Sequence, residues 1–287
     1  MVERNLQQQA SMCHIHSNTA LPDTTDTIER GMMLHPTDPR RERILLMGPA
    51  NSSKSWSWLT IAKWMKETSA PGLFYVADTD LAWEGQRPLD GSLDDRIVQT
   101  DTFDYDTFED VIQQARLKHQ PGDWLVLDMV NKMWDFSQQA YFEKVFGKEL
   151  DDYWLETKKA GGNIGGDYGS NWTVINKLYD ALTLKIARYP GNVLACTPAQ
   201  EVRQPDSKTG KGGDDRDTLL QFGRFGYKPM GQKLLAHNFH TVLLLQEVPK
   251  AGWAYSSVKD RNRPLVNGEP LEDFVKSYLV KQAGWRF

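Results

Sequence analysis

The amino-acid sequence predicts an α/β fold in which a mostly parallel central sheet carries helices on both faces. Short apolar runs recur along the chain and alternate with segments of helical periodicity. A turn of small residues that ends in Lys-Ser follows the first apolar run and leads into a helical segment. Two further runs near the C-terminal end lie close enough in sequence to pair as antiparallel neighbours. Together these features are typical of an α/β domain.

Each element is expected from its apolar pattern and from the Pro-Gly and Gly-rich segments that bound it. The expected strands are residues 44–47, 73–77, 124–127, 193–197, 241–245 and 253–258. The expected helices are residues 56–67, 104–119, 137–159, 172–189 and 271–282. We divide the chain into an N-terminal arm (1–25), a core (26–265) and a C-terminal helix (266–287). The arm is polar and aperiodic, which indicates either disorder or a tether that docks on a neighbouring subunit.

Composition restricts the class of protein. The 287 residues carry a formal net charge of −4 and 40% hydrophobic residues, which is ordinary for a soluble domain. This charge argues against a uniformly basic nucleic-acid-binding surface but leaves room for a local basic groove. Cys13 and Cys196 offer neither a disulfide framework nor zinc spacing, so we expect a reducing cytoplasm. We expect no membrane association, because no apolar run approaches the roughly 20 residues of a membrane span.

The turn after the first strand has the pattern of a P-loop with one exception. Its backbone N–H groups and the positive end of the following helix are expected to bind a phosphate group. Lys54 would reach the terminal phosphates and Ser55 would hold Mg²⁺. Ser53 stands where the pattern requires glycine, so a turn without a nucleotide remains an alternative. The expected nucleotide-binding residues are Gly48, Pro49, Ala50, Asn51, Ser52, Ser53, Lys54, Ser55 and Trp56.

Aspartates follow two of the expected strands. Asp78 and Asp80 come after residues 73–77, and Asp128 closes the run 124–127. The carboxyl ends of parallel strands are where α/β sheets place reactive groups. Asp128 resembles a Walker B aspartate, which holds Mg²⁺, usually through water. Each aspartate taken alone is also compatible with a helix cap or a turn.

Residues 203–233 form the least globular stretch inside the chain. Seven basic residues and four acidic ones give it a local charge of +3 (7 − 4). Aromatic residues at positions 222, 225 and 227 lie among these cations, a mixture that suits stacking on single-stranded bases. A solvated surface loop is the alternative. The expected DNA-binding residues are Lys208, Lys211, Arg216, Arg224 and Lys228.

The order of these pieces, over roughly residues 30–265, resembles RecA-like P-loop ATPases, particularly the short RecA-core ATPases of bacteriophages implicated in recombination and single-strand annealing. The resemblance implies that Asp80 polarises the attacking water, although the family more often has Glu there. It places DNA-facing loops near residues 160–170 and 203–231. It also implies that Lys259 and Arg261 insert into the ATP site of a neighbouring subunit.

The leading expectation is therefore an oligomeric ATPase, forming a ring or filament, that uses ATP and Mg²⁺ and acts on single-stranded DNA in recombination or replication. One alternative is a DNA helicase or a packaging-type motor, because the same core serves these roles. Another is a nucleotide-binding structural or regulatory protein in which Ser53 marks weak hydrolysis.

Overall fold

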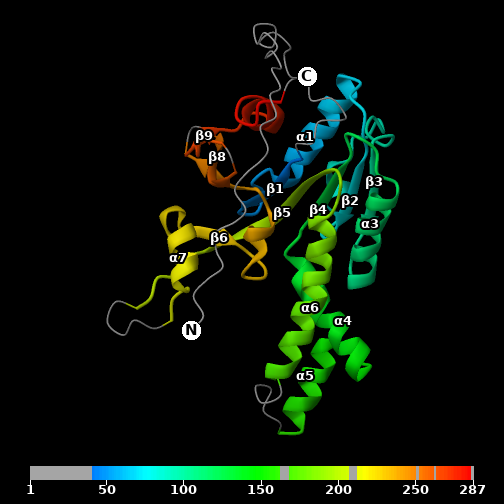
Figure 1. The fold of residues 1–287 in the computed structure, drawn as a ribbon, viewed down its shortest axis with the longest axis vertical. Helices are drawn as coiled ribbons and strands as arrows, with labels where there is room; N and C mark the ends of the chain where they lie inside the picture. The colour runs from blue at the N-terminus through cyan, green and yellow to red at the C-terminus, as the bar shows by residue number, and fades with distance from the viewer. Residues whose placement is uncertain (1–40, 162–167, 207–211, 250–251, 262, 286–287) are drawn as a thin grey trace, which may run out of the picture. The chain divides into compact units, whose positions relative to one another are not determined.

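The structure is a computed structural model, and it describes residues 41–161, 168–206, 212–249, 252–261 and 263–285. The chain divides into two compact units, residues 1–32 and 33–287, and every element below belongs to the second. The expected N-terminal arm lies outside the described residues. The described strands form one sheet in the order β3-β2-β4-β5-β1-β7-β8-β9, with β6 paired to β5 (Figure 1).

The strands are β1 (Arg43–Gly48), β2 (Phe74–Asp78), β3 (Ile97–Asp101), β4 (Trp124–Asp128), β5 (Asn192–Glu201), β6 (Tyr227–Pro229), β7 (Thr241–Val248), β8 (Gly252–Asp260) and β9 (Glu269–Pro270). The helices are α1 (Lys54–Glu67), α2 (Ala82–Gln86), α3 (Tyr105–Leu117), α4 (Lys132–Phe146), α5 (Leu150–Lys159), α6 (Tyr168–Ala187) and α7 (Arg216–Phe222). Short turns of 3₁₀ helix, η1 (Gly223–Phe225) and η2 (Leu235–Asn238), and a π-helix, η3 (Val275–Val280), complete the described elements.

The sheet is parallel from β3 to β7 and antiparallel beyond it. β1 runs parallel to both β5 and β7, whereas β8 pairs antiparallel with β7 and β9 pairs antiparallel with β8. The predicted α/β fold, with a mostly parallel sheet and antiparallel strands at the C-terminal end, is therefore confirmed.

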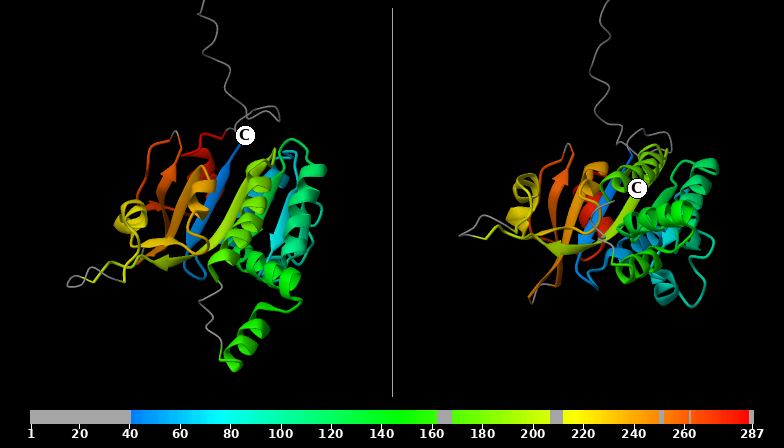
Figure 2. Two further views of the ribbon diagram at one scale, coloured as in Figure 1. Left: turned by 60° about the horizontal axis from the view of Figure 1, so that its bottom comes forward. Right: turned by 90° about the horizontal axis from the view of Figure 1, so that it is seen from below.

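Alternation of side chains along each strand builds a core on both faces of the sheet. In β1, Leu45 and Met47 pack on the face covered by α3, α4 and α6. Ile44 and Leu46 pack on the opposite face, against α1 and η3 (Figure 2). The expected helices on both faces are thus present, and they hold the carboxyl ends of β1, β2 and β4 in place.

Several elements differ from the expectation. β3, α2, α7, β6 and β9 were not predicted, and α7 and β6 lie within residues 203–233, which were expected to form a loop. The helix expected over 137–159 is two helices, α4 and α5, separated at Gly147. Gly147 ends α4 in the left-handed conformation, with φ of 64°, which favours glycine. Toward the C-terminal end, the helix expected over 271–282 is the shorter η3.

Candidate functional site

The P-loop connects the end of β1 to the start of α1. Gly48 is required there, because a Cβ atom would lie 2.4 Å from the Ser52 Oγ and 2.9 Å from the Leu245 carbonyl oxygen. Asn51 and Ser53 both adopt φ of 61°, in the left-handed region. Helix α1 begins at Lys54, two residues before the expected start. Ser53 thus has the backbone conformation for which the P-loop pattern requires glycine.

The Lys54 ammonium group lies inside this loop. Its Nζ donates hydrogen bonds to the carbonyl oxygens of Gly48 and Pro49, at 3.2 and 2.7 Å, and to the Ser52 Oγ at 3.1 Å. The side chain is buried. Burial lowers the pKa of Lys54, and the nearby Cys196, Asp128 and Asp80 oppose this shift. Lys54 is therefore the cation at the centre of the loop, and carbonyl oxygens of the loop accept its hydrogen bonds.

Asp128 lies at the end of β4, beneath the start of α1, and is fully buried. The Trp58 Nε1 donates a hydrogen bond of 3.0 Å to its Oδ2. Among the described residues its Oδ1 is buried without a hydrogen-bond partner. Burial raises the pKa of Asp128, while Ser55 and Trp58 lie close enough to oppose the shift. A carboxylate beside Ser55 with one oxygen left without a hydrogen-bond partner fits a metal ion with its water.

Trp58 was not singled out from the sequence. It lies four residues after Lys54 on the same face of α1, so its helical spacing was the available signal.

The two aspartates after β2 have different environments. Asp78 is buried, and its carboxylate accepts hydrogen bonds from the backbone N–H groups of Ala82 and Trp83, at 3.1 and 2.9 Å. It therefore anchors the start of α2. Asp80 is exposed at the rim of the site. Although the side chain is exposed, desolvation of its carboxylate and the negative charges of Asp128 and Asp78 raise the pKa of Asp80 to about 6.

Lys54, Ser55 and Asp80 line one cavity of about 620 Å³, and Asp78 and Asp128 lie outside its lining. A second cavity of about 580 Å³ continues along α1 and shares Trp56 and Gln86 with the first. The first cavity is lined by Ala50, Asn51, Ser52, Ser53, Lys54, Ser55, Trp56, Asp80, Ala82, Gln86, Met129 and Pro198. Gln86, Met129 and Pro198 were not expected here, because only the fold brings α2 and the ends of β4 and β5 to the P-loop.

Lys259 and Arg261 lie at the opposite edge of the sheet from the P-loop. In the sheet register Asp260 pairs with Thr241 on β7, and Thr241 pairs with Ile44 on β1. Ile44 lies four residues before Gly48. That offset corresponds to about 13 Å along the strand. The Lys259 Nζ donates to the carbonyl oxygens of Phe239 and Ala236, whereas the Arg261 side chain is exposed. Neither residue belongs to the nucleotide cavity of its own chain.

The basic segment is only partly described. Lys208 and Lys211 lie outside the described residues, as do residues 162–167 of the other expected DNA-facing loop. Arg216 is exposed at the start of α7, and the Arg224 guanidinium lies 4.4 Å from the centre of the Phe225 ring. Lys228 forms an ion pair with Asp214.

The aromatic residues of this segment face inward. Phe222 is buried, and Phe225 and Tyr227 pack against the core. The expectation that Phe222 stacks on a base is therefore wrong, because its ring belongs to the hydrophobic core.

Two properties of the described residues concern metals and membranes. No group of three or more His, Cys, Asp or Glu side chains that could hold a metal occurs among them. A Mg²⁺ ion at Ser55 and Asp128 would thus depend on phosphate oxygens for its remaining ligands. Within the same described part of the chain, no helix has the length and apolar character needed to cross a membrane.

Comparison with known proteins gives no family for the chain. No family model matches it, and no curated protein matches it. Among solved structures, the crystal structure of the RadB recombinase is similar over 78% of this chain and 83% of that chain, with 15% sequence identity and a TM-score of 0.41.

Proposed function

We propose that this protein binds and hydrolyses ATP as a RecA-like P-loop ATPase. The observation that carries the proposal is the single cavity in which Lys54, Ser55 and Asp80 meet beside the unpaired oxygen of Asp128. Backbone N–H groups at the start of α1 favour a phosphate group. Lys54, now held by loop carbonyls, would transfer its hydrogen bonds to the terminal phosphates.

Magnesium fits this donor set. The Ser55 hydroxyl and the Asp128 carboxylate would hold the ion, Asp128 through water. When bound, Mg²⁺ would neutralise charge on the phosphates. Trp58 fixes the orientation of Asp128 through its hydrogen bond to Oδ2, which leaves Oδ1 for the metal side.

The second cavity suits the nucleoside. It begins at Trp56, an exposed ring next to Ser55, and continues between Leu59, Pro88 and Leu93. An apolar slot beside a phosphate cradle fits a planar base, and an aromatic ring can stack on it. ATP would therefore extend from the P-loop along α1.

Asp80 is the proposed general base. It lines the phosphate cavity, and its pKa of about 6 is close to neutrality, as is favourable for proton transfer. Asp78 is unsuited to the role because backbone N–H groups of α2 occupy its carboxylate.

We further propose that the oligomeric protein acts on single-stranded DNA in recombination or replication. The support is the +3 charge of residues 203–233 and the exposure of Arg216, together with the RecA-like order of motifs. Lys259 and Arg261 would reach the nucleotide of a second copy. A helicase or packaging-type motor shares these requirements, and strand-displacement activity distinguishes it.

The primary test measures ATP binding and hydrolysis with and without single-stranded DNA. We expect Lys54→Ala to abolish ATP binding by calorimetry, while Lys276→Ala, at an exposed position on η3, binds normally. Hydrolysis by Lys54→Ala at the parental rate would refute the P-loop assignment. ATP binding without turnover by the parental protein would favour the regulatory alternative instead.

The DNA test uses the basic segment. Replacing Lys208, Lys211 and Arg216 by Gln should weaken single-stranded DNA binding and flatten the slope of log affinity against log salt by about 0.7 per lost phosphate contact. Lys118→Gln, at an exposed position outside this segment, is the control and should leave the slope unchanged. An unaltered slope in the triple variant, measured by fluorescence anisotropy, would place the DNA elsewhere.

A further inference from the structure

Helix α5 packs against its own chain along one side only. On that side Leu150 and Tyr153 contact the aromatic cluster around Phe142 on α4, and the rings of Tyr153 and Phe142 are 5.0 Å apart. α5 lies at the end of the helical extension formed with α4 and α6 (Figure 1). None of its residues is buried. The side of α5 turned away from α4 is therefore exposed.

The outer face of α5, which we define by Asp151, Leu155 and Lys158, combines an apolar centre with charged ends. Residues spaced by three, four and seven positions lie on one face of a helix, and these three residues have that spacing. Leu155, in the middle of the face, is 55% exposed, and the adjacent Trp154 is 37% exposed. An apolar side chain is thus presented to solvent between an acid and a base.

The charges of α5 are separated by sign along the helix. The first turn carries Asp151 and Asp152, and the last turn carries Lys158 and Lys159. None of these four side chains forms an ion pair within the described part of the chain. The helix dipole favours this order of charges. The dipole does not account for the exposed leucine midway between them.

A second copy of α5 in antiparallel orientation matches this pattern. If two copies cross at Leu155, residues equally far from Leu155 on either side face each other. Asp151 then meets Lys159 of the second copy, and Asp152 meets Lys158 of the second copy. Each charge lies about 4–6 Å from the crossing point along the axis, because a helix rises 1.5 Å per residue. A parallel arrangement would instead set like charges against each other, which is unfavourable.

We propose that the outer face of α5 is a docking surface for α5 of a second copy of this chain, bound in antiparallel orientation. Leu155 of each copy would lie at a two-fold axis, with Trp154 beside it and four ion pairs around this apolar centre. The contact is short, since a helix of ten residues spans about 15 Å. It therefore suits copies that other contacts already hold at a high effective concentration.

This contact goes beyond the proposed function, and it requires no nucleotide. A two-fold contact pairs the same surface on both copies, whereas the proposed ATPase assembly uses two different surfaces head to tail. The α5 contact would therefore link two such assemblies.

Disulfide formation by Leu155→Cys tests the proposed axis. A cysteine at a two-fold axis meets its own counterpart, so this variant should cross-link two copies without a second substitution. The full chain is used with Cys13→Ser, which leaves buried Cys196 as the one other thiol. We expect Leu155→Cys to form linked dimers at least about tenfold faster than Leu117→Cys, at an exposed position on α3, because docking raises the effective concentration of the thiols.

Two charge variants, each carrying Leu155→Cys, test the orientation. Asp151→Lys with Asp152→Lys makes both ends of α5 positive, and Lys158→Asp with Lys159→Asp makes both ends negative. Either variant alone should cross-link about tenfold more slowly, because four exposed ion pairs become repulsions. An equal mixture of the two variants should restore the rate, with disulfides that join mainly unlike copies. Circular dichroism checks that both variants retain their helix content.

Three results would overturn the inference. Cross-linking of Leu155→Cys at the rate of Leu117→Cys would show that copies do not meet at α5. A rate that neither charge variant changes, or a mixture that does not recover, would show that α5 does not pair in antiparallel orientation. Adding Lys54→Ala should leave the cross-linking rate unchanged, so these outcomes are separate from failure of the proposed ATP binding.

Discussion

Ser53 carries a conformational cost that glycine would avoid. Its φ of 61° places Cβ in the unfavourable left-handed region, at about 1–2 kcal/mol, and its side chain makes no capping hydrogen bond to α1. Glycine has more freedom in the unfolded chain, which offsets about 0.4–1 kcal/mol. We therefore expect Ser53→Gly to raise the free energy of unfolding by about 0.5–1 kcal/mol in urea titrations, without weakening ATP binding.

Ser52→Gly is the matched control for this prediction. The Ser52 Oγ accepts a hydrogen bond from Lys54, and its backbone is outside the left-handed region. Its removal should lower the stability and weaken ATP binding. A lower stability of Ser53→Gly would contradict the strain assigned to position 53.

If Asp80 is the general base, as proposed, the reaction has a defined dependence on pH. A general base must be deprotonated, so activity should be present above its pKa and lost as the pH falls through about 6. We expect kcat/KM for ATP to fall about tenfold per pH unit below that value. Asp80→Asn removes the base and supplies the profile due to ATP's own ionisation. If the two profiles have the same shape, Asp80 is not the base.

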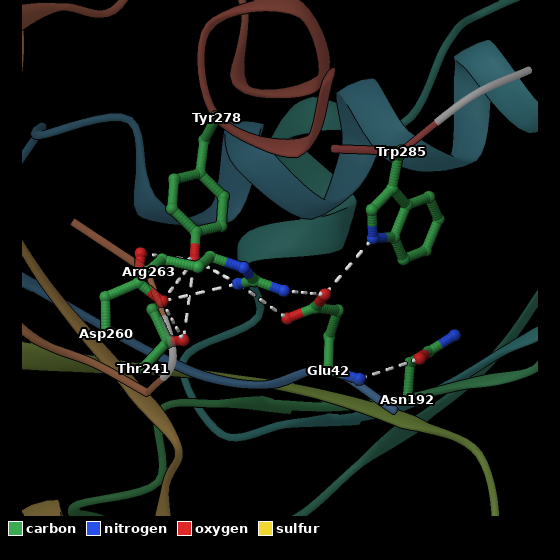
Figure 3. A network of polar contacts seen from close by, with 7 residues as sticks. All are labelled: Glu42, Asn192, Thr241, Asp260, Arg263, Tyr278 and Trp285. Carbon is green, nitrogen blue, oxygen red and sulfur yellow. Dashed lines mark hydrogen bonds and ion pairs between the residues drawn. The ribbon is translucent and has the colours of Figure 1, made fainter. Parts of the chain in front are cut away.

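At the scale of elements, one network attaches the C-terminal segment to the sheet. Arg263 links Glu42, 221 residues away in sequence, to Asp260, and the Trp285 Nε1 donates to Glu42 at 3.2 Å (Figure 3). The Asp260 side chain is fully buried and that of Glu42 is 8% exposed, so losing their shared cation leaves unpaired charge in the interior.

We expect Arg263→Met to lower the free energy of unfolding by about 3 kcal/mol, as for other broken buried pairs. Adding Glu42→Gln should restore part of the loss, because it removes one of the two unpaired carboxylates. Lys281→Met breaks an exposed pair with Glu269 and should cost less than about 1 kcal/mol. Urea unfolding followed by circular dichroism measures the free energy of unfolding of all three variants. Equal losses of that free energy in Arg263→Met and Lys281→Met would show that the network adds no more stability than an exposed ion pair.

The sequence predicted the elements whose pattern is local. The buried parallel strands are continuous apolar runs, and β1, β2, β4, β5 and β7 were recognised because β-strands buried on both faces look this way. β3 was missed because it is a half-buried edge strand that ends in polar residues. β6 and β9 were missed because they are only three and two residues long.

In the candidate site, too, some features follow from local sequence patterns and others only from the fold. Lys54, Asp80 and Asp128 lie near one another, since the carboxyl ends of parallel strands meet on one side of the sheet. The network around Arg263 and the position of Arg261 depend on the pairing of β1, β7 and β8 across about 200 residues. No local pattern specifies that pairing, so these features became visible only in the fold.

At the scale of the whole molecule, the strand ends on the two sides of the described sheet carry different side chains. The phosphate cavity lies at the carboxyl edge, and exposed Arg261 lies with Lys259 at the amino edge. If the cations of one copy bind the nucleotide of the next, as proposed, the contacts are head-to-tail, and such contacts generate rings or filaments. In such an assembly each nucleotide would lie between the P-loop of one copy and the cations of the next.

This arrangement predicts complementation between two inactive variants. Lys54→Ala lacks the P-loop cation but keeps Arg261, whereas Arg261→Ala should bind ATP nearly normally and hydrolyse it slowly. Arginine residues supplied in trans elsewhere contribute roughly 10³–10⁵ in rate, so the loss should be plain. In an equal mixture, about a quarter of head-to-tail interfaces join an intact P-loop to an intact Arg261. We therefore expect the mixture to show about a quarter of the parental ATPase rate. Native mass spectrometry shows whether the two variants co-assemble. If they do and the mixture shows only the summed rates of the two variants, Arg261 has no role in trans.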